Sequence, residues 1–508
     1  MLLTADQCHR AAQSHDPRFD GVFFIGIATT RIYCRPICPA RISKSSHRRF
    51  FASAAAAERF GYRPCLRCRP ELAPGKASVD AVSHLAVAAA LRIAAGALNG
   101  RSVSALAREL GVSERHLRRA LEREIGVSPV ELAQTHRLLL AKRLLADTAL
   151  SVTRVAFASG FQSLRRFNTT FRERYRLSPS EVRRTARTSS AHSRSTERAV
   201  TPSDPVRELF PLTLAYRAPF AWNEILKSIE RSALPGMEVV QGKRYARTVR
   251  LGDHSGVIVA RNAGSPASTA PLAARTHLEI EISLSLLPVL MALLSRLRRF
   301  FDLDAEPAVV DAHLAQGGLG ALVETHRGIR VPGAFDAFEA VLTALLEGAR
   351  PGFIRHHQLA ERVVQALGDP IDSGIPGLDR LTPTASRVAA AGAEVLSALG
   401  VPPTRARTLV AVARALANGD LTLEPGGEVG AAQRALLDIE GVSERLAARI
   451  AMRTLYWPDA FAFDDAALQR AAGVTGRGAL RAQAERWRPW RAYAAQHLWL
   501  RDADASPA

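Results

Sequence analysis

The sequence predicts a multi-domain protein with a small α/β domain, an all-α domain of two helix-turn-helix units, an α+β domain and a final all-α domain containing a helix-hairpin-helix. Three observations support this prediction. The chain has 508 residues, several times the size of an ordinary domain. Four of its five cysteines fall into two short pairs near the N-terminus. A helical unit recurs about 49 residues after its first occurrence, and helical patterns fill the chain from residue 336 onward.

The positive charge of the chain is concentrated in its first two-fifths. Residues 1–200 hold 34 Lys and Arg against 15 Asp and Glu (+19), whereas residues 201–508 hold 34 against 33 (+1). A field of one sign over one segment indicates a polyanionic partner, most simply nucleic acid. Solubility alone is the alternative explanation.

No membrane partner is expected. The chain has no run of about 18 uncharged apolar residues, and Asp6, Gln7 and His9 stand where a signal peptide needs an apolar core. We therefore expect a cytoplasmic protein. In a reducing compartment, paired cysteines favour a metal site over disulfides, and Cys8 is left without a predicted role.

Residues 1–76 are expected to form the small α/β domain. Apolar, β-rich runs lead into the first cysteine pair, which is followed 26 residues later by a second pair. Such pairs can present four sulfurs to one tetrahedral Zn²⁺. The predicted cofactor is therefore one zinc ion with four ligands, Cys34, Cys38, Cys65 and Cys68.

This zinc could be structural or reactive. A domain of this size has a marginal core, so the ion could serve only as a staple. However, many arginines surround the cysteines, among them Arg35 and Arg67, which we predict to contact DNA. One Zn²⁺ with four thiolates carries a net charge of about −2, which keeps each sulfur deprotonated and nucleophilic.

The runs TTRIYCRPIC (29–38) and GYRPCLRC (61–68) resemble the N-terminal domain of the Ada methylphosphotriester repair proteins. The resemblance implies that Cys34 is both a zinc ligand and the acceptor of a methyl group from a phosphotriester in DNA. Methylation would change the cluster charge from about −2 to about −1 and strengthen DNA binding in a salt-sensitive way. The protein would be consumed by the reaction.

Residues 79–184 are rich in Ala and Arg and predict helices. A short helix, a glycine turn and a serine N-cap form a unit in which Ala107 and Gly111 are matched about 49 residues later by Ala156 and Gly160. The small alanine lets two helices approach, and the glycine allows the sharp turn of a helix-turn-helix.

The two units resemble the AraC-type DNA-binding domain over roughly 80 residues. The resemblance implies recognition helices at about 114–123 and 163–174 that enter successive major grooves of promoter DNA, and it implies RNA polymerase as a partner. The candidate contacts to bases or phosphates are Arg115, His116, Arg118, Arg119, Arg165, Arg166 and Asn168. Alternatively, any one of these arginines could lie on a solvated helix face or contact phosphate without reading sequence.

Residues 185–205 are rich in Ser, Thr, Arg and Pro, which is typical of a flexible linker. Residues 206–335 contain β-rich stretches such as 212–216 and 277–282 with helical stretches between them. They predict an α+β domain with a loop at 264–272.

Residues 336–502 predict a series of helices. Within them, residues 436–447 predict a helix-hairpin-helix, whose turn directs backbone N–H groups at a DNA phosphate. Gly441 and Ser443, in that turn, are therefore predicted DNA contacts.

Across residues 206–502 the chain resembles AlkA, the alkyladenine-type DNA glycosylase of the helix-hairpin-helix superfamily, most clearly at 212–220 and 484–493. The resemblance implies an all-α glycosylase domain in which Asp465 is catalytic. Its carboxylate would stabilise the oxocarbenium-like sugar as a cationic base leaves and would help water attack C1′. The base would first be flipped out of alkylated double-stranded DNA, into a pocket that includes Trp499.

Several residues depart from the AlkA pattern. The hairpin contains Glu-Gly-Val-Ser at 440–443 in place of Pro-Gly-x-Gly, and Arg445 and Arg449 replace aromatic pocket residues. The turn 346–350 lacks the family's glutamine and leucine. Because an Asp pair that opens a helix is often only an N-cap, Asp465 could also be a relic.

The leading hypothesis is a fusion protein that takes a methyl group onto Cys34, activates transcription through the AraC-type units and excises alkylated purines such as 3-methyladenine. It would be a single-turnover methyltransferase and a DNA-3-methyladenine glycosylase. The alternative is a transcriptional activator with a structural or sensory zinc and a non-catalytic, glycosylase-like DNA-binding module. No Pro-Cys-His-Arg signature occurs, so direct repair of O6-alkylguanine is not expected.

Overall fold

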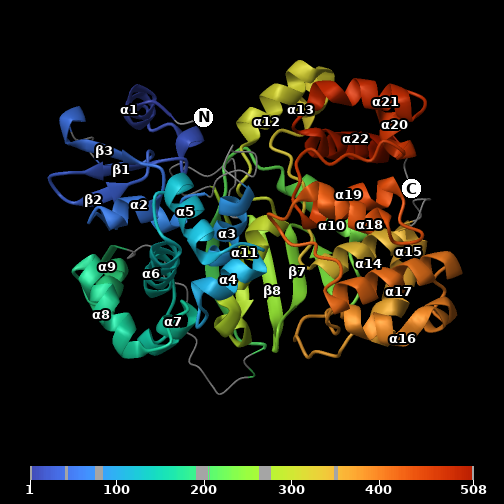
Figure 1. The fold of residues 1–508 in the computed structure, drawn as a ribbon, viewed down its shortest axis with the longest axis horizontal. Helices are drawn as coiled ribbons and strands as arrows, with labels where there is room; N and C mark the ends of the chain where they lie inside the picture. Colours follow the sequence, from blue (N-terminus) through green and yellow to red (C-terminus); the bar gives the residue numbers. More distant parts are fainter. Residues whose placement is uncertain are drawn as a thin grey trace.

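The computed structural model describes residues 3–40, 44–74, 84–189, 204, 206–262, 276–347 and 353–505. Two sheets and two helical regions follow one another along the chain in the predicted order (Figure 1). The predicted fold class is confirmed. No helix in the described part of the chain has both the length and the hydropathy that a bilayer crossing requires.

The first sheet is small and mixed, with strand order β3-β1-β2-β4. Strand β1 is antiparallel to both of its neighbours, and β2 is parallel to β4. Cys8 packs in an apolar cluster with Phe23 and Ile25, so it is a core residue. The elements of this region are α1 (Ala5–Gln13), β1 (Phe24–Ile27), β2 (Ile32–Cys34), β3 (Arg48–Phe51), α2 (Ala54–Arg59) and β4 (Arg63–Pro64).

The second region is all-helical and contains the two predicted helix-turn-helix units. The turn glycines have positive φ, +68° at Gly111 and +85° at Gly160. A Cβ at Gly160 would lie 2.3 Å from the Asn99 side chain, so only glycine fits there. Ser113 and Ser163 cap the helices that follow. The helices are α3 (His84–Ala94), α4 (Val103–Glu109), α5 (Glu114–Glu124), α6 (Pro129–Asp147), α7 (Val152–Ala158), α8 (Leu164–Tyr175) and α9 (Pro179–Ser189).

Part of the predicted linker is helical, because α9 continues to Ser189. Residues 190–203 and 205 lie outside the described residues, so the rest of the linker stays a prediction. The predicted loop at 264–272 and residues 348–350 of the turn at 346–350 also lie outside them.

The second sheet is antiparallel, with strand order β5-β9-β8-β7-β6. Its alternating sequence explains its packing, because Leu278, Ile280 and Ile282 on β9, the strand between β5 and β8, all point into the core and are fully buried. The strands are β5 (Leu209–Ala215), β6 (Glu238–Gln241), β7 (Arg244–Leu251), β8 (His254–Asn262) and β9 (His277–Ser283). The helices of this region are α10 (Trp222–Ser232), α11 (Leu290–Phe300), α12 (Pro307–Leu314) and α13 (Gly320–Thr325).

The C-terminal region is helical and contains the predicted hairpin, formed by α18 and α19. Helices α12 and α13 share an apolar cluster with the last three helices, so residues before the predicted boundary at 335/336 pack on this region (Figure 1). The helices are α14 (Ala337–Glu347), α15 (Phe353–Leu367), α16 (Ala385–Ala398), α17 (Pro403–Asn418), α18 (Val429–Leu437), α19 (Glu444–Thr454), α20 (Ala466–Ala471), α21 (Arg477–Ala484) and α22 (Arg491–Ala505).

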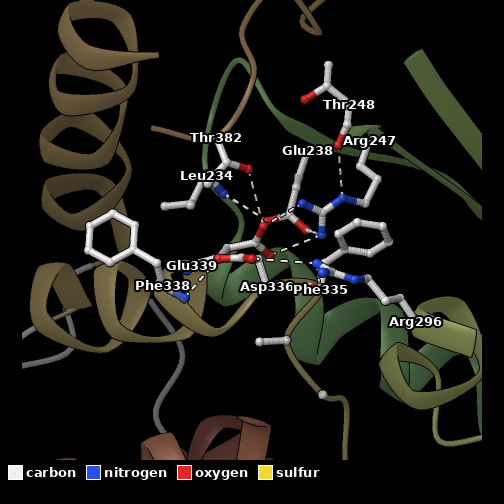
Figure 2. Close-up of polar contacts among 12 residues, drawn as sticks. Leu234, Glu238, Arg247, Thr248, Arg296, Phe335, Asp336, Phe338, Glu339 and Thr382 are labelled. Carbon is white, nitrogen blue, oxygen red and sulfur yellow. Dashed lines mark hydrogen bonds and ion pairs between the residues drawn. The ribbon is translucent and has the colours of Figure 1, made fainter. Parts of the chain in front are cut away.

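A buried ionic network fixes α14 to the second sheet (Figure 2). The guanidinium of Arg247, on β7, donates two hydrogen bonds, of 3.0 and 2.5 Å, to the carboxylate of Glu339 at the start of α14. Glu238, on β6, lies 3.5 Å from the same guanidinium. Burial raises the pKa of Glu238, and the neighbouring charge of Glu339 adds to this effect, whereas Arg247 opposes it. The network therefore positions α14, whose last residue, Glu347, enters the site described below.

The second helix-turn-helix unit is not separate from the second sheet. One apolar cluster contains Leu138, Val155 and Phe167 from the helical unit together with Leu212 and Ile280 from the sheet. These two regions consequently share a core.

Candidate functional site

The four predicted zinc ligands come together at one end of the first sheet. The sulfurs of Cys34, Cys38, Cys65 and Cys68 all lie within 4.8 Å of one another. Four sulfurs at about 2.3 Å from one tetrahedral ion would be about 3.8 Å apart, so the site fits Zn²⁺ with little adjustment. Cys34 is partly exposed, whereas the other three cysteines are buried.

Arg35 braces the cluster instead of facing solvent. It is 6% exposed, its Nε donates to Asp20 at 2.8 Å, and its guanidinium also donates to the Cys68 carbonyl at 3.2 Å. The prediction that Arg35 contacts DNA directly does not fit this burial, which sequence could not show. Arg67 is exposed, and its backbone N–H lies 3.4 Å from the Cys65 sulfur.

A buried ionic junction connects the metal site to helix α6. Lys142, on α6, donates to the Cys65 carbonyl at 3.2 Å and to Glu71 at 2.6 Å, and both charged side chains are almost fully buried. Arg69 bridges Glu71 and Asp147, at 3.1 and 2.7 Å. Burial would raise the pKa of Glu71, but Lys142 and Arg69 hold it below its usual value.

A second junction connects the first sheet to both helical units. Glu58, on α2, is 1% exposed and accepts hydrogen bonds from Tyr33 at 3.0 Å and from Thr135 of α6 at 3.1 Å. Arg174 of α8 lies 3.9 Å away. Burial raises the pKa of Glu58 to about 7. No motif in the sequence signalled either junction.

The predicted recognition helices correspond to α5 and α8. The side chains of Arg115, His116, Arg119, Arg165 and Arg166 are exposed on them. Arg118 and Asn168 are partly buried, and Arg118 forms an ion pair of 2.6 Å with Glu114 one turn earlier.

The hairpin turn between α18 and α19 is exposed at Gly441 and Ser443. Gly441 has φ +86°, and a Cβ there would lie 2.0 Å from the Thr408 hydroxyl, so glycine is required. That hydroxyl donates to the Glu440 carbonyl at 3.1 Å. Ser443 caps α19 by accepting a hydrogen bond of 3.2 Å from the Leu446 N–H.

Asp465 is the N-cap of α20. Its Oδ1 accepts hydrogen bonds from the N–H groups of Ala467 and Leu468, at 2.9 and 3.3 Å. Asp465 is therefore an N-cap, as the alternative interpretation of the acidic pair predicted. However, both capping bonds go to Oδ1, so Oδ2 takes no part in the cap. The side chain is partly exposed, so Oδ2 can still act on a substrate.

Arg449, on α19, connects the other members of the predicted base pocket. It forms an ion pair with Glu347 of α14, and its Cζ lies 5.9 Å from the ring centre of Trp499 on α22. The charges of Glu347 and Asp465 both raise the pKa of Arg449. Asp465 and Trp499 thus converge on one cation, and Glu347 is a member of the site that sequence reasoning missed.

Comparison with known proteins decides the family. A Mycobacterium tuberculosis protein named "Probable bifunctional transcriptional activator/DNA repair enzyme AlkA" is 37% identical over 500 residues, which cover 97% of this chain and 96% of that protein. This chain belongs to that family. The predicted resemblances are confirmed, because the metal binding domain of Ada matches residues 7–71, a helix-turn-helix domain residues 106–185 and the AlkA N-terminal domain residues 211–336.

Two further proteins are similar to the C-terminal part of this chain. Escherichia coli DNA-3-methyladenine glycosylase 2 is 34% identical over 288 residues, or 56% of this chain and 96% of the relative. The 3-methyladenine DNA-glycosylase from Archaeoglobus fulgidus has a similar fold, with a TM-score of 0.50 and 19% identity over 58% of this chain and 100% of that one. The predicted zinc cofactor is confirmed by the Ada domain together with the cysteine cluster.

Proposed function

We propose that this chain repairs and senses DNA alkylation through three activities: methyl transfer from a phosphotriester to Cys34, promoter activation through α5 and α8, and excision of alkylated purines at Asp465. Family membership supports DNA repair, transcription activation and glycosylase roles. The division into domains at 1–76, 79–184, 206–335 and 336–502 is part of this proposal.

Methyl transfer is supported above all by the cluster of four cysteine sulfurs within 4.8 Å of one another, to which Cys34 contributes the one residue that is not fully buried. When bound, Zn²⁺ keeps the thiolates deprotonated at neutral pH. The Cys34 sulfur attacks the methyl carbon, the carbon–oxygen bond breaks, and its electron pair stays on the phosphate as a phosphodiester. The cluster charge changes from about −2 to about −1, so repulsion from DNA decreases.

The methyl-transfer test is mass spectrometry of peptides from zinc-loaded protein mixed with methylphosphotriester DNA. We expect one added methyl group on the Cys34 peptide and none on the Cys38, Cys65 or Cys68 peptides. Unmodified DNA is the control. An unmodified Cys34 peptide would leave the metal site with a structural role and favour the non-enzymatic alternative.

For transcription, we propose that the exposed arginines of α5 and α8 contact promoter DNA, and that RNA polymerase is the downstream partner. Arg165→Ala and Arg166→Ala should each weaken promoter binding without changing methyl transfer to Cys34. Mobility-shift assays at fixed salt measure this effect, and unchanged binding would assign these side chains to the solvated face.

For excision, the supporting observation is that Asp465 keeps one carboxylate oxygen free of the helix cap and, like Trp499, interacts with Arg449. Asp465→Asn keeps the cap acceptor and removes the charge. Release of 3-methyladenine from alkylated DNA should therefore be lost in this variant. Absence of release of every damaged purine tried from the unaltered protein, cationic in the nucleotide as 3-methyladenine is or uncharged, would indicate a non-catalytic DNA-binding module, and so would release unchanged in D465N.

A further inference from the structure

The predicted base-binding pocket around Asp465 and Trp499 contains a fixed positive charge. Arg449 is the residue that lies against Trp499 and within the field of Asp465. Its guanidinium stays protonated under all relevant conditions and offers five N–H donors in one plane. Any base that stacks on Trp499 therefore comes close to a cation and to several hydrogen-bond donors.

The ion pair of Arg449 presents its positive end to this pocket. Glu347 comes from the end of α14, which the buried Arg247–Glu339 contact fixes to the second sheet. Among the described contacts, Arg449 interacts with both Trp499 and Asp465, whereas Glu347 pairs only with Arg449. Glu347 is thus a positioning residue that restrains Arg449 and offsets part of its charge.

A permanent cation discriminates between two kinds of damaged purine. A base such as 7-methylguanine carries a positive charge in the nucleotide, so Arg449 repels it at close range. An uncharged base such as 1,N6-ethenoadenine is not repelled, and its ring nitrogens can accept hydrogen bonds from the guanidinium. The uncharged base also needs more help, because it leaves with a negative charge, whereas the cationic base leaves neutral.

We propose that Arg449 makes this pocket select uncharged damaged purines over cationic ones by donating hydrogen bonds to the departing base. The C1′–N9 bond breaks, and its electron pair goes to the purine, whose negative charge Arg449 stabilises. Water adds to C1′ and gives its proton to solvent through Asp465, and the purine takes a proton from solvent. This inference rests on the proposed glycosylase function and specifies its substrate class.

The test compares single-turnover excision of 1,N6-ethenoadenine and 7-methylguanine from otherwise identical duplexes by the full chain. Arg449→Met should slow excision of ethenoadenine by about tenfold or more, and it should speed excision of 7-methylguanine because Glu347 then faces the pocket unpaired. Glu347→Gln should have the opposite effect on 7-methylguanine. The double variant should keep the ethenoadenine defect while losing the gain on 7-methylguanine.

Arg434→Met is the matched control, because Arg434 lies on the exposed side of α18 and its loss makes the same change in net charge. It should leave the ratio of the two rates unchanged. If R449M and E347Q change the excision rates of both bases by the same factor, or if R449M leaves the ratio of the two rates unchanged, as R434M does, the inference is overturned. If the unaltered chain releases neither base, the proposed glycosylase function fails instead. Melting curves show whether each variant is folded, and E347Q tests the same idea with Arg449 intact.

Discussion

Replacing Lys142 by methionine would test the buried junction beneath the metal site. The Nζ atom lies 2.6 Å from Glu71, and both side chains are 3% exposed or less. Methionine keeps the length and removes the charge, so Glu71 keeps only Arg69 as a cationic neighbour. Removing one member of a buried pair costs about 3–5 kcal/mol, and because Arg69 remains we expect about 3 kcal/mol.

This loss should be visible in calorimetry. For a unit of about 150–250 residues, each kcal/mol shifts Tm by about 2–4 °C, so Lys142→Met should lower the transition that includes the metal domain by about 6–12 °C. Release of zinc to a coloured chelator should accelerate in parallel, because Lys142 also holds the Cys65 carbonyl.

A matched control separates burial from charge. Lys227 is 51% exposed and lies 3.8 Å from Glu224, so Lys227→Met should change stability by less than about 1 kcal/mol. Adding Glu71→Gln to Lys142→Met should restore most of the lost stability, since the buried carboxylate that has lost one of its two cations is then removed. Equal Tm values and zinc-release rates for K142M and K227M would refute the reasoning.

Three further predictions concern pH, backbone geometry and charge. Burial raises the pKa of Glu58 in the folded state from 4.5 to about 7. Between these two pH values the folded state binds more protons at Glu58 than the unfolded state does, so the protein loses stability as pH rises. In denaturant titrations, the free energy of unfolding of Glu58→Gln relative to wild type should rise by about 3 kcal/mol between about pH 5 and pH 8. A difference between the two proteins that does not change with pH would contradict this. In chemical denaturation, Gly441→Ala should lower the free energy of unfolding more than Gly473→Ala does. Both glycines have positive φ, but only a Cβ at Gly441 would clash, with the Thr408 hydroxyl. Equal losses of stability would show that the clash is not the cause. Methylated protein should bind promoter DNA more tightly than unmethylated protein, by a factor that decreases as salt rises in fluorescence titrations; a salt-independent factor would argue against a charge effect.

Features that depend on a few residues close together in the chain were predictable from sequence. The cysteine pairs, the glycine turns at Gly111 and Gly160 and the serine caps are local patterns whose chemistry requires particular residue types. The same holds for Asp465 as a helix cap. Local rules placed all of these correctly because nothing distant changes them.

Contacts between distant segments were not predictable. Lys142 and Glu71 are 71 residues apart, and Thr135 and Glu58 are 77 apart. Sequence marks Lys142 only as a charge within an apolar helix, which suggests a solvated residue, whereas tertiary packing buries it against a carboxylate. The burial of Arg35 was not predictable for the same reason, since its partner Asp20 lies outside the cysteine motif.

The strongly basic N-terminal part of the chain and the nearly neutral C-terminal part are attached to each other by buried contacts. Arg217, which follows β5, donates to the Asp20 carbonyl at 3.0 Å, and the Asp20 carboxylate pairs with Arg35 beside the metal cluster. All three residues are 6% exposed or less, and the apolar core shared by the second helix-turn-helix unit and the second sheet reinforces the attachment. A half with a net charge of +1 is therefore attached to one of +19 through buried contacts. Under the proposed function, we expect attraction of DNA phosphates by the basic part to raise the local DNA concentration for both parts. The C-terminal part can then carry Glu440 in its hairpin and Glu347 beside Arg449 without having to provide the affinity for DNA itself.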